Sequence, residues 1–272
     1  MKKTFDEKIG TRELVAIIMF TIGIKFKDTT PHLLYTKGQT AAWMIPLISM
    51  LILFIPFYIL ITLLKKHQIG LIDLFFKLLG KFFGVIICAG LFINFFAGMI
   101  FNFRGHVDII STLIYQRTPL FILAVIMIIV CFFISYQGFS SISRTSWLIF
   151  PVFQILMLFL IFLSWKDLNW DNLFPLWGPG VRTIVKESFV HLSIVGEIML
   201  LGVFYTYLRK DKDFLIGSFA GIGISCFQIA VFFIVMQLIF NYPFVAEMSF
   251  PYQQLTRYVM IGNFVSHIEG IF

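Results

Sequence analysis

The residues that could carry chemistry in this sequence are the few charges inside long apolar runs. Glu197 lies in IVGEIML, far from any polar flank, and Lys25, Lys27 and Asp28 follow an uncharged stretch. Ionisable residues at membrane depth are costly and usually face a bundle interior or a watery cavity. Glu197 is therefore a candidate ligand contact, proton carrier or gate. The alternative is a structural carboxylate that Lys25, Lys27 or Arg104 neutralises.

The charges near the N-terminus fall in TIGIKFKDTTP, residues 21–31. The uncharged part before them, residues 14–24, is too short for a bilayer core that needs about 20 apolar residues per helix. Either the charges form an outer loop, or a spanning helix is interrupted at mid-membrane. We expect the interruption, with Gly23 and Pro31 around it. An unwound segment exposes amides, carbonyls and helix ends that suit a zwitterionic ligand.

Other polar residues carry weaker signals. Asn94, Gly98 and Asn102 recur every four residues and so share one helix face, which indicates either helix packing or a ligand contact. His191 lies on a different face from Glu197, and we expect it to be structural. We find no nucleophile paired with a base, no metal-ligand spacing and no phosphate loop. We therefore expect no enzyme, no catalytic residue, no metal and no cofactor.

Composition places these charges in a membrane protein. The 272 residues are 59% hydrophobic, 18% aromatic and 13% charged, and the mean hydropathy is +0.93, outside the soluble globular range. The formal charge of +7 does not indicate nucleic acid, because Lys and Arg lie in short loops between apolar runs. They are more numerous on the N-terminal side, which predicts a cytoplasmic N-terminus. The expected surroundings are a lipid bilayer.

The apolar runs predict an all-α polytopic membrane protein. An amphipathic helix is expected at the membrane interface over residues 69–83, because charged residues recur there every four positions. Gly217, Gly221 and Ser225 form a face for close helix contact. A polar turn is expected at 137–146. The chain is expected to contain seven spans and the start of an eighth, near residues 13–30, 41–64, 84–103, 119–136, 147–165, 188–208, 214–240 and from 263.

Several stretches, in their order and spacing, resemble the spore-germination permease family, the B subunit of nutrient germinant receptors. They are KFKDTTP followed by AAWMIPLIS, then NLFPLWGPGV, GEIML and the final SFPYQQLTRYVMIGNFVSHIEGIF. The resemblance covers essentially the whole chain. That family is similar to the amino acid, polyamine and organocation transporters. Their LeuT-type fold has two inverted five-helix repeats and places its ligand between broken first and sixth helices.

The resemblance implies one transmembrane domain over residues 1–272, with a first repeat at 13–165 and an incomplete second repeat at 185–272. The family has ten spans, so the chain is expected to be truncated at its eighth. Many members have small residues where this chain has Lys25 to Lys27, so the identity of the ligand does not carry over. By position, the implied ligand-binding residues are Gly23, Ile24, Lys25, Phe26, Asn94, Gly98, Val195, Gly196 and Glu197.

The function implied by the resemblance is that of a permease-like subunit of a nutrient germinant receptor. It would bind an amino acid or a nucleoside and trigger germination with A-type and C-type partner subunits in the spore inner membrane. The alternative is a proton- or cation-coupled amino-acid transporter, with Glu197 as the coupling carboxylate. A third interpretation is a structural or non-functional remnant of a longer protein.

Overall fold

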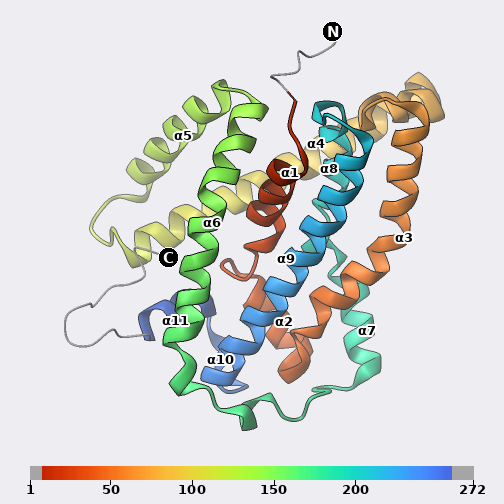
Figure 1. Cartoon of the computed structure of the whole chain (residues 1–272). Helices are drawn as coiled ribbons and strands as arrows, with labels where there is room; N and C mark the ends of the chain where they lie inside the picture. The colour runs from red at the N-terminus through yellow and green to blue at the C-terminus, as the bar shows by residue number, and fades with distance from the viewer. Residues whose placement is uncertain (1–7, 259–272) are drawn as a thin grey trace.

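A computed structural model describes residues 8–258. Expectations for residues 1–7 and for an eighth span near 263 lie outside these residues. Figure 1 shows a bundle of helices in this order: α1 (Thr11–Ile18), α2 (Thr30–Gly38), α3 (Met44–His67), α4 (Leu71–Leu113), α5 (Leu120–Tyr136), α6 (Phe139–Leu163), α7 (Val181–Val190), α8 (Ile198–Phe204), α9 (Asp211–Ile239), α10 (Phe244–Glu247) and α11 (Pro251–Tyr258).

Four helices within residues 8–258 are long and apolar enough to cross a membrane: α3, α4, α6 and α9. A fifth is added if α7 and the segment Leu192–Tyr207, bent by 55°, form one broken span. α5 is apolar and has 17 residues. The predicted class, an all-α polytopic membrane protein, is confirmed. The expected seven spans and the inverted repeats stay predictions.

α9 is the central helix of the bundle, and most of its surface is buried against α1, α3 and their neighbours. Its small-residue face is packed closely: a Cβ at Gly221 would lie 2.8 Å from Ile18 Cδ1, and Gly217 meets α1 in the same way. The Ser225 hydroxyl lies 3.2 Å from the sulfur of Met19. The predicted helix-contact face is therefore confirmed, and its partner is α1 with the segment after it.

α4 differs from the expected interface helix and third span. It is interrupted at Gly80, whose φ of 77° favours glycine. A Cβ at Gly84 would lie 2.8 Å from the ring of Phe76, eight residues earlier. This short distance shows that the chain turns back sharply at Gly80. The helix then continues to residue 113, beyond the expected end at 103. One charged pair is satisfied along the helix, since Arg104 lies 2.9 Å from Asp108 four residues later.

α6 begins at Phe139, inside the segment expected to be a polar turn. The Ser143 hydroxyl donates to the Phe139 carbonyl at 2.6 Å, and the Ser146 hydroxyl donates to the Ile142 carbonyl at 2.9 Å. Hydroxyls bonded to the carbonyl four residues earlier are compatible with a continuous helix. The turn is therefore shorter than predicted and is centred on Gly138, whose φ is 83°.

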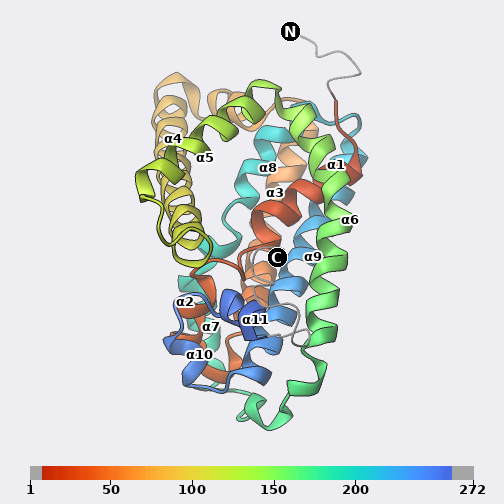
Figure 2. The ribbon, with the colours of Figure 1, turned by 90° about the vertical axis from the view of Figure 1, so that its left-hand side faces the viewer.

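α4 and α5 lie at the edge of the bundle, away from α9 (Figure 2). Their apolar side chains are largely exposed, reaching 76% for Phe101 and 77% for Phe121. Lipid tails are as apolar as such side chains, so a bilayer covers them at no cost. This distribution is that of an integral membrane protein.

Candidate functional site

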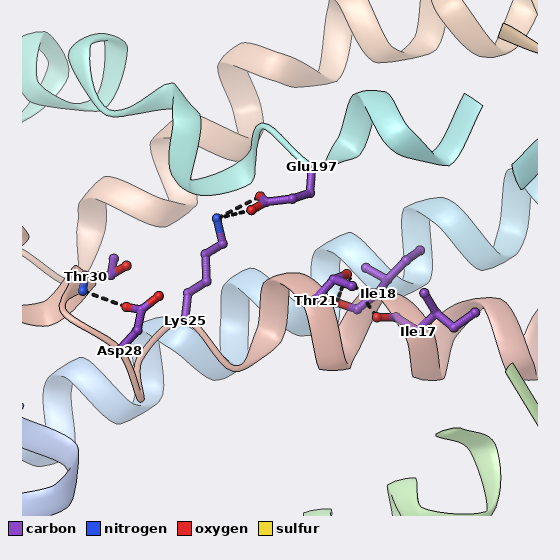
Figure 3. Close-up of polar contacts among 7 residues, drawn as sticks. All are labelled: Ile17, Ile18, Thr21, Lys25, Asp28, Thr30 and Glu197. Atoms are coloured by element: carbon purple, nitrogen blue, oxygen red, sulfur yellow. Dashed lines mark hydrogen bonds and ion pairs between the residues drawn. The ribbon is translucent and has the colours of Figure 1, made fainter. Parts of the chain in front are cut away.

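The first helix is broken between Gly23 and α2. A π-helical turn, Met19–Gly23, continues α1 and ends there. Pro31 contributes to the break because it has no N–H for the carbonyl four residues earlier. The Asp28 carboxylate accepts the Thr30 amide at 2.6 Å and so helps to start α2 (Figure 3). The segment from 24 to 29 is therefore irregular backbone.

This first break lies about halfway along α9. A Cβ at Gly23 would lie 3.1 Å from the hydroxyl oxygen of Ser225, the central residue of α9. Phe26 is fully buried and stacks on Phe232 of α9, with ring centroids 4.1 Å apart. Because α9 is long enough to span a membrane, the charges of the break lie level with the middle of a candidate span. The other side of the bundle must shelter them.

A second break separates α7 from α8. The 3₁₀ turn Leu192–Val195 connects them, and Glu197 follows it directly before α8. His191 is satisfied within α7, since its Nδ1 lies 2.9 Å from the Glu187 carbonyl oxygen and 3.4 Å from the Glu187 carboxylate. The expected structural role of His191 is confirmed. The two breaks leave backbone ends of two interrupted helices facing one region.

An ion pair joins the two breaks. The Lys25 ammonium lies 2.6 Å from one carboxylate oxygen of Glu197 and 2.7 Å from the other (Figure 3). The Lys25 side chain is 14% exposed and that of Glu197 is 25% exposed. Solvent screens a pair this short and this sheltered less than it screens a surface salt bridge. The pair is a direct polar link between the first and second breaks.

The ion pair borders a cavity of about 420 Å³. The first break contributes Ile24, Lys25, Lys27 and Asp28, and the second contributes Glu197. Lys27 also lies against two aromatic rings, with its ammonium 5.2 Å from the centroids of Phe153 and Tyr252, a cation–π arrangement. The wall thus carries two cations and two carboxylates at the depth of the breaks.

Two further elements contribute to the wall. Asn102 and His106 come from α4, and Tyr252, Gln253 and Thr256 come from α11. Asn102 and His106 continue the four-residue spacing that begins at Asn94, so the sequence held a signal for them. α11 has a fainter signal: polar residues at positions 253 and 256 share one helix face.

The residues expected at the ligand fall into two groups. Ile24, Lys25 and Glu197 line the cavity. The other six do not line it. Three of them are buried in the core, namely Gly23, Phe26 and Val195, and Gly196 packs on the backbone of Ser193. On α4, Asn94 is exposed and Gly98 has open space beside it. On α4, the residue of that spacing that lines the cavity is Asn102, two helical turns after Asn94.

Comparisons with known proteins point to spore germination proteins. A family model described as "Spore germination protein" matches residues 8–272. The chain is 30% identical over 211 residues to spore germination protein A2 of Bacillus subtilis, a match that covers 75% of the chain and 57% of that protein. It is 23% identical over 188 residues to the putative spore germination protein YfkT of the same species, covering 69% and 52%.

A third relative is spore germination protein XB of Bacillus anthracis, 22% identical over 154 residues, covering 56% of the chain and 43% of that protein. The chain thus spans about half the length of the curated relatives it matches. No solved structure is significantly similar to it. Because the family model matches nearly every residue, the chain belongs to the spore germination permease family.

Proposed function

We propose that the protein is a permease-like subunit of a spore nutrient germinant receptor, and that the cavity between the two breaks binds its nutrient. The observation that carries the proposal is the cavity itself, which is bordered by both broken helices and by the Lys25–Glu197 pair. Its volume of about 420 Å³ lies within the usual range for small-molecule sites, about 300–1,000 Å³. It suits an amino acid or a nucleoside.

The charges of the wall favour a zwitterion. Its carboxylate would take the place of Glu197 on Lys25, and its ammonium would take the place of Lys25 on Glu197. Each side chain then keeps one partner of opposite charge, so neither is left as an unpaired charge in a sheltered site. A nucleoside would instead use the hydrogen-bonding groups of Asn102 and Gln253 and the ring of Tyr252. The site thus favours the amino acid.

Other parts of the proposal follow from the family. Residues 13–165 would form the first repeat and 185–272 part of the second, so that each break belongs to the first helix of a repeat. The N-terminus would be cytoplasmic, in the spore inner membrane. A-type and C-type receptor subunits would receive the signal when the cavity fills.

A second candidate function is proton- or cation-coupled amino-acid transport. It is favoured by Glu197, a carboxylate that lines the cavity and is 25% exposed. Such a group can exchange a proton or cation as the ligand enters and leaves. Transport and sensing differ in one measurable respect, which is net movement of the ligand across the membrane.

We expect spores that carry Glu197→Gln to lose their response to the nutrient that wild-type spores recognise, because Gln offers Lys25 no charge. Germination is followed as the fall in optical density after adding L-alanine or inosine. Glu247→Gln is the matched control, since Glu247 is exposed and does not line the cavity. A normal response in Glu197→Gln spores and in gene-deleted spores contradicts the receptor function.

The same variant separates the transporter from the sensor. The full-length protein is placed in liposomes with a proton gradient, and uptake of tritiated L-alanine or inosine is measured. The receptor function predicts binding without net uptake. Uptake that Glu197→Gln abolishes and Glu247→Gln preserves assigns transport.

A further inference from the structure

Gln253 is a buried polar residue on the wall of the cavity. It belongs to α11 and is one of the residues that line the cavity, although it is only 7% exposed. Its Oε1 atom has no hydrogen-bond partner within residues 8–258. A buried amide oxygen without a donor is costly. Such an atom on a ligand cavity indicates where a donor belongs.

The orientation of the Gln253 amide follows from the first break. Its Nε2 donates to the carbonyl oxygen of Lys27 at 2.5 Å. That carbonyl is open to a side chain because the residue four positions later is Pro31, which has no N–H. A flipped amide would set two oxygens against each other. Nε2 therefore donates to the Lys27 carbonyl oxygen, and Oε1 remains available to accept a hydrogen bond.

α11 is also held on the first break by aromatic contacts. The ring of Tyr252 lies 5.1 Å from that of Phe26 and 5.8 Å from that of Phe232, and the Lys27 ammonium lies over it. These edge-to-face and cation–π contacts fix the helix that carries Gln253. The acceptor therefore has a defined position relative to Lys25 and Asp28.

We propose that Gln253 determines specificity at the nutrient site: its Oε1 accepts a hydrogen bond from an ammonium, amide N–H or hydroxyl of the ligand. This inference rests on the proposed function of the cavity. A ligand carboxylate next to Gln253 would face the Oε1 oxygen, and two oxygens without a proton between them repel. Gln253 therefore orients the hydrogen-bond donor of the ligand toward α11. The ligand's carboxylate then lies toward Lys25. Ligands without a donor are discriminated against because Oε1 stays unpaired.

Three variants of the full-length protein in lipid nanodiscs test this. Gln253→Met keeps the size of the side chain and removes the acceptor. Gln253→Glu keeps an acceptor and loses the bond to the Lys27 carbonyl. Gln254→Met is the matched control, because Gln254 is the exposed neighbour on the same helix. The dissociation constants of tritiated L-alanine and tritiated inosine are measured, with propionate as a competitor that lacks the ammonium of alanine.

We expect Gln253→Met to weaken the bound probe at least about tenfold, while Gln254→Met and Gln253→Glu stay within about threefold of wild type. If alanine is the probe that binds, its advantage over propionate should be smaller against Gln253→Met than against wild type, and the remainder is the pairing of its ammonium with Glu197. The Gln253→Glu variant carries the test where Gln253→Met does not fold: a tenfold loss in it assigns the effect to the Lys27 bond and overturns the proposal.

Two failures are distinguishable. If wild type binds a probe and Gln253→Met binds it as tightly as Gln254→Met does, the role of Gln253 is wrong and the cavity remains the site. If wild type binds neither probe, the proposed function of the cavity fails, and the role of Gln253 fails with it.

Discussion

Replacing Lys25 with methionine is expected to lower the free energy of unfolding by about 2–3 kcal/mol. The change leaves the Glu197 carboxylate unpaired in a sheltered site, and removing one partner of a fully buried ion pair typically costs about 3–5 kcal/mol. We place the effect below that range because the two side chains are 14% and 25% exposed. The thermal unfolding midpoint in detergent measures it.

The double variant Lys25→Met/Glu197→Gln supplies the decisive comparison. Removing both charges leaves no unpaired ion, so the double variant should recover most of the stability that the single variant loses. Lys66→Met is the control, because Lys66 is exposed at the end of α3. If the losses of unfolding free energy in Lys25→Met and Glu197→Gln simply add up in the double variant, the two side chains do not interact and the pair does not join the breaks.

Replacing Gly221 with leucine is expected to destabilise the bundle by about 3 kcal/mol or more. Even a Cβ at this position would lie 2.8–2.9 Å from atoms of Ile18, and overpacking of a close contact typically costs about 1–3 kcal/mol before the rest of a leucine is accommodated. α1 would be forced away from α9 and would carry the first break with it. We therefore expect loss of ligand binding as well as a lower unfolding midpoint.

Gly223→Leu is the matched control for this prediction. Gly223 lies on the same helix two residues later, and the nearest atom to a Cβ there is the terminal methyl of Met50 at 3.7 Å. A flexible methionine yields easily, so this variant should fold and bind nearly as wild type does. Equal stability of the Gly221 and Gly223 variants would contradict the close contact between α1 and α9.

The broken first helix could be predicted from the sequence because its causes are local. Too few apolar residues precede Lys25 for a full span, and Pro31 removes an amide that an unbroken helix would need. The glycine face of α9 was predictable for the same reason. Gly217, Gly221 and Ser225 have a helical spacing, and small side chains on one face have few uses other than close contact.

The pairing across the cavity could not be fixed from the sequence. Lys25, Lys27 and Arg104 were all eligible partners for Glu197, and the choice depends on how the breaks face each other in space. Arg104 pairs with Asp108 four residues along α4, a local interaction that any helix permits. Lys27 lies over two aromatic rings. Of these three cations, Lys25 is the one that the structure shows paired with Glu197.

The extent of the site along α4 and the part played by α11 were also beyond the sequence. The sequence shows that Asn94, Gly98 and Asn102 share one helix face. Which of them lies at the level of the cavity depends on where the helix begins, and the interruption at Gly80 sets that beginning. α11 is an eight-residue helix, and the shared face of Gln253 and Thr256 does not show which segment that face meets. Tertiary contacts with Phe26 and Lys27 place it at the cavity.

The central claim is that the cavity between the two breaks holds the nutrient, and the germination response of spores carrying Asn102→Trp tests it most directly. Asn102 is exposed and lines the cavity, so tryptophan fills the space without disturbing a packed core. Ile100→Trp is the control, on the opposite face of α4 and also exposed. The account predicts that Asn102→Trp spores fail to respond to the nutrient while Ile100→Trp spores respond normally. A normal response from Asn102→Trp spores at wild-type nutrient concentrations would contradict it.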